Sequence, residues 1–273
     1  MTHRALVLLL CSASLFSACG DGDSTGSGAS GAGSSTGGAG GEGAAGTGTG
    51  TGAGSVSSCF ATFDGGDVLN ADVGDAAALT ENFSLAARIR PEDVADGQTM
   101  FIAGRHLDGG PNGHYLRISN EGSLKAEYIV FIAAATCAVS SPLTIPASGE
   151  VHLLGSFDVA NTRIFIDGNI GAVADCGEPT VIDPMSTFTI GRSSTGQFPF
   201  SGSITDVMYI DGVFDSTFDT TTLGCENGAL VHYSFEDLAD SPDSVPDVCG
   251  AAPDAIVGEG PGVDDSDPSF ACE

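Results

Sequence analysis

The chain has 273 residues, 36 of them acidic and only eight basic, so its formal net charge is −28. Such a charge argues against nucleic-acid and anionic-membrane partners, and it fits a divalent cation, a cationic partner or simply a well-hydrated surface. Hydrophobic residues make up 41% of the sequence, which is enough for a packed core, although there is no Trp and there are only four Tyr.

Residues 1–18 are predicted to be a signal peptide. A basic start, Thr2-His3-Arg4, precedes an apolar run from Ala5 to Ala18, which is shorter than the roughly 20 residues that a membrane-spanning helix needs. The sequence Phe16-Ser17-Ala18-Cys19-Gly20 resembles the lipobox of bacterial lipoproteins, although the usual Leu stands one place early. The resemblance implies acylation at Cys19 and display on the outer membrane or cell surface. The alternative is an ordinary signal peptide cleaved near Ala18.

Residues 19–58 are almost wholly Gly, Ser, Thr and Ala after the cysteine. Such a segment cannot bury a core, so it is predicted to be a flexible linker. About 38 residues of this kind reach roughly 30–37 Å on average. The folded part is therefore expected over 59–273, which carries seven basic and 33 acidic residues.

From residue 59 onward the sequence predicts short β-strands joined by turns, with no convincing amphipathic helix. The segment 83–90 alternates strictly between apolar and polar residues, and Pro91 ends its ladder of hydrogen bonds. The expected strands are 59–63, 68–70, 83–90, 99–104, 115–118, 124–132, 151–157, 163–166, 171–175, 187–191, 204–210 and 229–236. This pattern predicts an all-β fold with two antiparallel sheets packed as a sandwich.

The clearest hairpin lies at 149–169. Its two strands are joined by Asp158-Val-Ala-Asn161, since Asp and Asn favour turns. Asp167-Gly168 then supplies the positive φ angle of a second tight turn.

An ordered set of motifs resembles the LamG-like jelly roll of the concanavalin A-like lectin/glucanase superfamily over about residues 60–215. The motifs are Phe63-Asp-Gly-Gly66, Phe83-Ser-Leu-x-Ala-x-Ile-x-Pro91, Val151-His-Leu-Leu154, Phe157-Asp158, Arg163-x-Phe-x-Asp-Gly168, Phe188-Thr-Ile-Gly-Arg192, Gly202-x-Ile204 and Val207. The chain departs from the family at Val151, where Trp is usual, and at Thr205, where Asp is usual and Asp206 follows. The resemblance implies a jelly-roll sandwich over residues 59–225.

Residues 226–273 are expected to form an acidic extension that wraps the sandwich and is held to it by disulfide bonds. The segment 229–236 alternates like a strand, and the rest is acidic and poor in apolar residues. It resembles the LxxxxxFDE…DSSG segment found beside such domains.

Six cysteines follow the linker: Cys59, Cys137, Cys176, Cys225, Cys249 and Cys272. An even number, without a CxxC pair or a histidine at ligand spacing, predicts three disulfides in an exported protein. Fifteen pairings are possible. Our preferred set joins Cys137 to Cys176, Cys59 to Cys225 and Cys249 to Cys272.

The sequence lacks the paired carboxylates of glycosidases on this fold. These enzymes commonly carry E-x-D-x-E on one strand, because an acid and a nucleophile must lie about 5–5.5 Å apart. The nearest acidic pairs, Glu92-Asp93, Glu236-Asp237 and Asp264-Asp265, lie at expected strand ends or in the extension. We therefore predict that the protein is not an enzyme.

Two groups of residues are candidate sites. Calcium needs six to eight oxygen ligands; the resemblance implies that Asp64, Asp67 and Asp206 could approach one another, because the first and last strands pair in a jelly roll. The second group is the loop that holds Arg105, His106, Asp108, Asn112 and His114. A ligand-binding role is conceivable for that loop, although a solvated loop is the plainer interpretation.

Together these features predict a surface-anchored, monomeric lipoprotein whose jelly roll recognises glycan or protein without catalysis, assisted by calcium, and contacts the membrane only through its lipid. The scarcity of aromatic residues counts against sugar stacking and favours a protein ligand or polar, calcium-assisted sugar contacts. One alternative is an envelope glycoside hydrolase or another polysaccharide-active enzyme with an unrecognised site. Another is a structural envelope protein with no small ligand.

Overall fold

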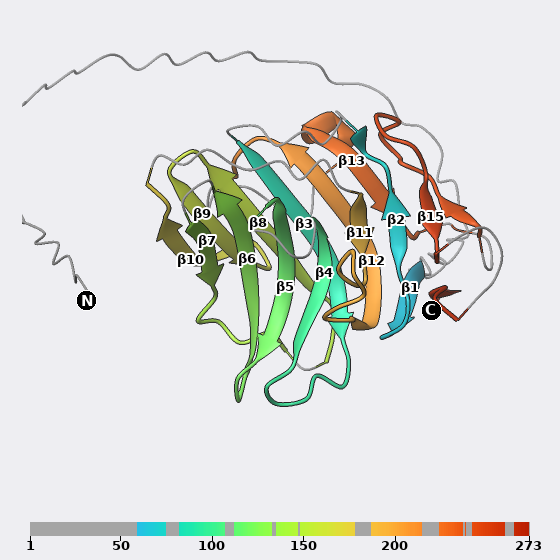
Figure 1. Cartoon of the computed structure of the whole chain (residues 1–273), viewed down its shortest axis with the longest axis horizontal. Helices are drawn as coiled ribbons and strands as arrows, with labels where there is room; N and C mark the ends of the chain where they lie inside the picture. Colours follow the sequence, from blue (N-terminus) through green and yellow to red (C-terminus); the bar gives the residue numbers. More distant parts are fainter. Residues whose placement is uncertain are drawn as a thin grey trace, which may run out of the picture. The chain divides into compact units, whose positions relative to one another are not determined.

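Two antiparallel β-sheets face each other in the computed structural model, as the sequence predicts for a jelly-roll sandwich (Figure 1). The structure describes residues 59–74, 82–106, 112–132, 135–146, 148–177, 187–214, 224–236, 238, 242–259 and 265–272. All of them belong to one compact unit, Ala53–Glu273. Cys19 and Asp108, two of the predicted site residues, lie outside the described residues.

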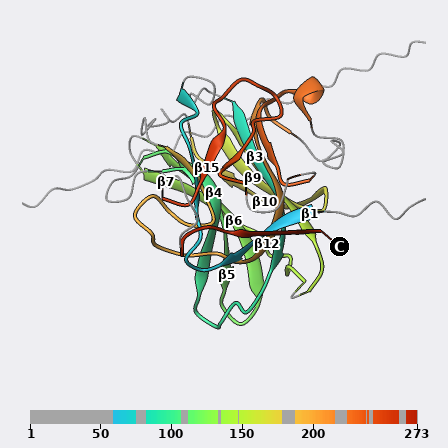
Figure 2. The ribbon, with the colours of Figure 1, turned by 90° about the vertical axis from the view of Figure 1, so that its right-hand side faces the viewer.

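Sheet 1 carries the central hairpin of the sequence and the two ends of the domain. Its order is β10 (Asn169–Asp175), β9 (Asn161–Ile166), β8 (Val151–Asp158), β3 (Phe83–Pro91), β12 (Ser201–Asp211), β1 (Cys59–Asp64) and β16 (Ser269–Cys272). A further strand, β13 (Ala229–Ser234), pairs with the second half of β12. Figure 2 shows the C-terminal strand running beside β1.

Sheet 2 forms the other layer. Its order is β14 (Ser244–Val245), β15 (Ala255–Val257), β2 (Leu69–Ala71), β11 (Phe188–Ile190), β4 (Thr99–Arg105), β5 (His114–Asn120), β6 (Leu124–Ile132) and β7 (Ala135–Ser140). The expected strands are present, whereas β7, β14, β15 and β16 were not foreseen. A short 3-10 turn, η3 (Cys225–Asn227), precedes β13. The strands after residue 226 therefore belong to both sheets: β13 and β16 to sheet 1, β14 and β15 to sheet 2. Strands β16 and β14 each lie at one edge of their sheet.

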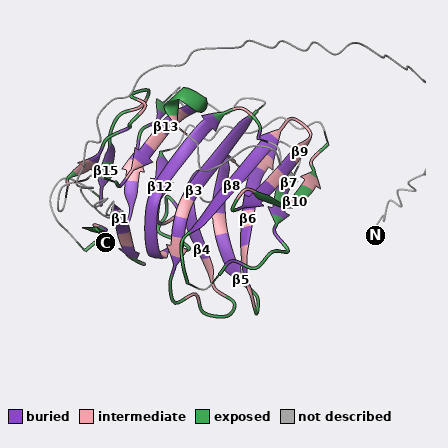
Figure 3. Ribbon diagram, turned by 180° about the vertical axis from the view of Figure 1, so that it is seen from behind, coloured by how far each residue is buried: buried purple, intermediate pink, exposed green. Residues whose placement is uncertain are grey.

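The core lies between the sheets and follows the period-two pattern. On β3, Leu85, Ala87 and Ile89 face sheet 2 and are fully buried. Sheet 1 is also buried on parts of its outer face, where Leu154, Met208 and Phe214 belong to a second apolar cluster. Figure 3 shows the resulting burial along β12 and β8, and β3 is buried except at Arg88 and Arg90, which are half-buried. Both faces of these strands are therefore covered, which alternation alone does not reveal.

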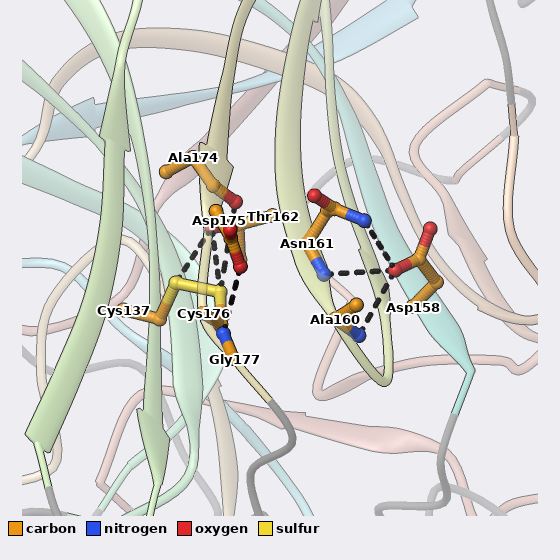
Figure 4. The surroundings of a disulfide bond; sticks show 9 residues. All are labelled: Cys137, Asp158, Ala160, Asn161, Thr162, Ala174, Asp175, Cys176 and Gly177. Carbon is orange, nitrogen blue, oxygen red and sulfur yellow. Dashed lines mark hydrogen bonds between the residues drawn. A yellow bond between two sulfur atoms is a disulfide. The ribbon is translucent and has the colours of Figure 1, made fainter. Parts of the chain in front are cut away.

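The central hairpin forms as its turn residues predict. Asp158 pairs with Asn161 at the end of β8 and β9. The Asp158 carboxylate accepts hydrogen bonds from the backbone of Ala160 and Asn161 at 3.1 and 2.8 Å (Figure 4). Asp167 and Gly168 have φ angles of 49° and 73°, as expected of the second turn.

Three disulfides close the domain, and their presence is typical of an extracellular or secreted protein. Cys137 of β7 is bonded to Cys176, just after β10, as predicted (Figure 4). The other two predicted pairings are wrong: the bonds join Cys59 to Cys272 and Cys225 to Cys249. The reason is that β16 returns alongside β1, so Cys59 and Cys272 are direct partners in the strand register.

Tyr128 of β6, in sheet 2, packs directly against Gly155 of β8, in sheet 1. A Cβ atom at Gly155 would lie 2.2 Å from Cγ of the Tyr128 ring, which is fully buried. We expect Gly155→Ala to lower the free energy of unfolding by about 1–3 kcal/mol, the usual cost of overpacking a core. For a domain of this size each kcal/mol corresponds to a shift in Tm of roughly 2–4 °C.

Thermal unfolding with the disulfides intact measures this effect. Gly224→Ala is the matched control, because Gly224 has no neighbour within 4 Å of such a Cβ atom and has an extended φ of −177°. A Gly155→Ala variant that is as stable as the control would contradict this account of the packing between the sheets.

Candidate functional site

A pocket of about 800 Å³ opens at one end of the sandwich. Three connections surround it: the loop from β3 to β4, the β5–β6 hairpin and the segment that follows β7. The first two lie at the lower end of Figure 1. Its volume is within the range of small-molecule binding sites, which is roughly 300–1,000 Å³.

The lining of the pocket combines apolar walls with a few polar groups. The apolar residues are Pro91, Val94, Leu124, Ile145 and Pro146. The polar side chains come from Asp93, Asn120, Ser123 and Thr144. Leu124 and Ile145 belong to the main core, so the floor of the pocket is anchored in the rigid part of the sandwich. Such a composition is typical of sites that bind small molecules through a few well-placed hydrogen bonds.

Asn120 holds two of these walls together. Its backbone accepts a hydrogen bond from Gly97 N at 2.7 Å and donates one to the Gln98 carbonyl at 2.9 Å. Its side-chain amide donates to the Val94 carbonyl at 2.8 Å. The β3–β4 loop is therefore fixed to the hairpin without a ligand, and a pocket formed in advance requires little ordering when a ligand binds.

Asp93 is the ionisable member of the lining. Its φ angle is 51°, in the left-handed region that Asp adopts more readily than most residues. The residue is exposed to solvent. Glycoside hydrolysis requires two carboxyl groups that flank one bond, and the described lining supplies one.

The three aspartates predicted to bind calcium do not come together. Asp64 ends β1 opposite Ser201, whereas Asp206 lies five residues further along β12, roughly 17 Å away for an extended strand. Asp64 and Asp67 do share a turn, in which the Asp64 backbone N–H donates to the Asp67 carboxylate. Burial is the main cause that raises the pKa of Asp67 to about 6, and the negative charges of Asp64 and Asp267 contribute to the rise.

Asp206 has a structural partner instead. It is fully buried and forms an ion pair with Arg88 on β3, and a second carboxylate, Glu236, lies 3.4 Å from the same guanidinium. A β-bulge between Ile204 and Asp206 places Asp206 directly opposite Arg88. Because the bulge accommodates one extra residue, the displaced aspartate faces the outer side of sheet 1 and not the rim. No group of three or more His, Cys, Asp or Glu among the described residues is arranged to hold a metal ion.

The described ends of the predicted loop, 105–106 and 112–113, lie at the opposite end of β4 and β5 from the pocket. The structure brings its described members together: Arg105 is buried at the end of β4 and is opposite His114 in the strand register. Nδ1 of His106 donates to the Asn112 carbonyl at 2.7 Å. His114 differs most from the prediction. It is fully buried, with Nδ1 at 3.0 Å from the Tyr128 hydroxyl and its ring 4.8 Å from that of Phe83. His114 thus belongs to the core.

The aromatic residues near this loop form a closed cluster on the outer face of sheet 2. His106 stacks on Phe131 with ring centres 5.0 Å apart, and Tyr115 packs against Phe101 at 5.5 Å. Phe101 is 2% exposed and Tyr115 is 9% exposed. The rings cover one another and hold the base of the loop, so they leave little flat surface on which a sugar could stack.

Sequence reasoning missed the pocket because its walls come from three distant parts of the chain. Each part had a turn signal: Pro91 before one loop, Asn120 to Gly122 in the hairpin, and Pro146 in the third segment. Nothing in the sequence indicated that these turns converge. The pair Glu92-Asp93 was noted only as a failed catalytic pattern.

The family of the chain follows from its sequence. The profile of the concanavalin A-like lectin/glucanases superfamily matches residues 63–221. The chain belongs to this superfamily. Among curated proteins, none matches the sequence.

Solved structures share the fold of this superfamily member at low identity. A Bacteroides ovatus protein described as carbohydrate-binding is 17% identical, with a TM-score of 0.57 over 78% of this chain, which spans 61% of that protein's length. A pentraxin of Limulus polyphemus is 16% identical, with a TM-score of 0.50 over 64% of this chain and 86% of its own. A carbohydrate-binding domain of a Ruminococcus gnavus sialidase, bound to sialyllactose, is 14% identical, with a TM-score of 0.44. The match covers 55% of this chain and 85% of that domain.

None of the described helical segments is long and apolar enough to cross a membrane.

The burial of His114 predicts that the stability of the fold depends on pH. Desolvation is the main cause that lowers the pKa of His114 to about 3, and the nearby charges of Arg105 and His106 contribute to the lowering. The folded protein therefore keeps His114 neutral, while the unfolded chain takes up a proton near pH 6.5. Stability from this residue is complete above pH 6.5 and is lost as the pH falls towards 3. The loss approaches about 1.4 kcal/mol per pH unit.

Urea unfolding at pH 7, 5.5 and 4.5 measures this dependence. We expect the free energy of unfolding of His114→Gln to depend less steeply on pH than that of the wild type, whatever its stability at pH 7. The difference between the two slopes should correspond to one proton. Equal slopes in the two proteins, or an NMR titration of His114 near pH 6.5, would show that the imidazole is not held neutral in the core.

Proposed function

We propose that this protein is a non-catalytic glycan-binding module, held at the cell surface by a lipid on Cys19. The observation that carries the proposal is the preorganised pocket at the end of a lectin-like jelly roll. Its apolar walls suit the carbon skeleton of a sugar, and its polar side chains suit sugar hydroxyls. The similarity in fold to a Bacteroides ovatus protein described as carbohydrate-binding supports this assignment.

The carboxylates support binding over catalysis. Asp93 has no second carboxylate beside it in the described lining, whereas both retaining and inverting glycosidases use two. Asp206, the most buried aspartate, is neutralised by Arg88 on the outer face of sheet 1. A hydrolysis screen over a polysaccharide panel tests this part, and turnover lost in Asp93→Asn would establish an enzyme instead.

A blocked pocket tests the binding site. Thr144 is exposed and lines the pocket, so Thr144→Trp should fill it with little cost to the fold. We expect the variant to lose at least tenfold in affinity for every glycan that the wild type retains on a glycan array. The assay is run with calcium and with EDTA, because calcium binding remains a prediction of the sequence although Asp206 lies apart from Asp64 and Asp67.

Thr136→Trp is the matched control, because Thr136 is exposed on β7, away from the pocket. Equal weakening by both substitutions would point to general damage, and unchanged binding in Thr144→Trp would place the site elsewhere. Binding that is the same with calcium and with EDTA would contradict the prediction that calcium assists the ligand contacts.

The lipid anchor is supported by the lipobox-like sequence and by the three disulfides of the domain, which fit an exported protein. The linker of residues 19–58 would let the pocket reorient above the membrane surface. In a bacterial host that is fed a labelled fatty acid, we expect label on the wild type and none on Cys19→Ser. Equal labelling, or release of both proteins in soluble form, would contradict the anchor.

A further inference from the structure

The charge around the pocket points to the chemical class of its ligand. Asp93 is the single ionisable side chain among the described lining residues. No hydrogen bond or ion pair within the described part of the chain engages its carboxylate. Three more acidic residues, Glu92, Asp96 and Glu121, are exposed and directly adjoin lining residues in the sequence. Two basic residues, Arg90 and Lys125, adjoin the lining in the same way, so acidic residues outnumber basic ones around the pocket by four to two.

The basic residues of the domain are already engaged elsewhere. Five of the seven that follow the linker form ion pairs: Arg88 with Asp206, Arg117 with Glu127, Lys125 with Glu121, Arg163 with Asp158 and Arg192 with Glu259. Arg105 is 6% exposed. Arg90 lies over the ring of Phe60 at 6.0 Å.

Among the described residues, an anionic sugar would therefore find no basic side chain at this pocket that is not already engaged. Lys125 is the basic residue that lies nearest in sequence to the hairpin wall, and its ammonium is 3.6 Å from Glu121. Binding a carboxylated or sulfated glycan would require that pair to break, against the field of a domain with a formal charge of about −26. A cation entering the pocket meets an unengaged carboxylate and a favourable field.

We propose that the pocket binds a glycan that carries free amino groups, with the sugar ammonium paired to the Asp93 carboxylate. This inference rests on the proposed glycan-binding function and narrows it. The sugar rings would lie against the apolar walls formed by Val94, Leu124 and Ile145. The amine would lie at the mouth, where Asp93 is exposed and each partner keeps part of its hydration.

Calorimetry with matched oligosaccharides tests the proposal. The probes are a glucosamine oligomer, its fully N-acetylated counterpart and sialyllactose. The N-acetylated oligomer keeps the sugar skeleton and removes the charge, so it isolates the contribution of the amine. We expect the amino form to bind about tenfold more tightly, the low end for a charge-assisted hydrogen bond because Asp93 is exposed. Added salt should reduce the difference in affinity between the amino and the N-acetylated oligomer.

Asp93→Asn identifies the carboxylate, since Asn also tolerates the positive φ angle. We expect it to remove the preference for the amine, so that the amino and the N-acetylated oligomers bind the variant with equal affinity. The control is Asp211→Asn, which removes an exposed carboxylate at the far end of β12, roughly 30 Å from the pocket end of that strand.

Three results would overturn the proposal. Equal or tighter binding of the N-acetylated or sialylated sugar, lost in Thr144→Trp, would refute the amine while leaving the glycan site in place. Amine binding that survives Thr144→Trp, or that an oligolysine peptide of equal charge matches, would show adsorption to an acidic surface or recognition of a basic peptide. No binding of any glycan, here or on the array, would remove the proposed function itself.

Discussion

The pocket depends on the way Asn120 fixes the β3–β4 loop to the β5–β6 hairpin. Its side-chain amide reaches the Val94 carbonyl, and its backbone bonds to Gly97 and Gln98 on the same loop. These bonds join two segments that are separated by two strands of sheet 2, so a surface loop becomes a fixed wall. The hydrophobic core supplies the floor through Leu124 and Ile145. A rigid cavity at the end of a β-sandwich is the result, and rigid cavities bind small ligands with little ordering.

The distribution of charge is the second constraint on function. A domain with so few cations uses most of them to neutralise particular carboxylates, such as Asp206 beneath Arg88 and Asp158 beside Arg163. The remaining carboxylates give the surface a negative field that favours cationic groups and disfavours anionic ones. The charge distribution matters for this reason, because fold alone does not fix the ligand.

The sequence predicted the fold well and the site poorly, for physical reasons. Alternation of side chains along β3 and the turn at Asp158–Asn161 are local signals, and the structure confirms both. The family resemblance is confirmed as well. The pairing of Cys59 with Cys272 depends on where the last strand returns, which local patterns do not encode. His114 looked like a loop residue because neither its spacing nor its neighbours show that its ring turns inward to Tyr128.

The sequence did not predict the orientation of Asp206 or the position of the pocket, for a related reason. A β-bulge determines which way Asp206 faces, and the convergence of three distant loops determines where a ligand could enter. The most direct test of this account is an NMR chemical-shift map with the tightest glycan from the array. We predict that the shifts cluster in residues 93–97, 120–124 and 144–146. Shifts centred on the aromatic cluster of sheet 2, around His106 and Phe131, would contradict the central claim.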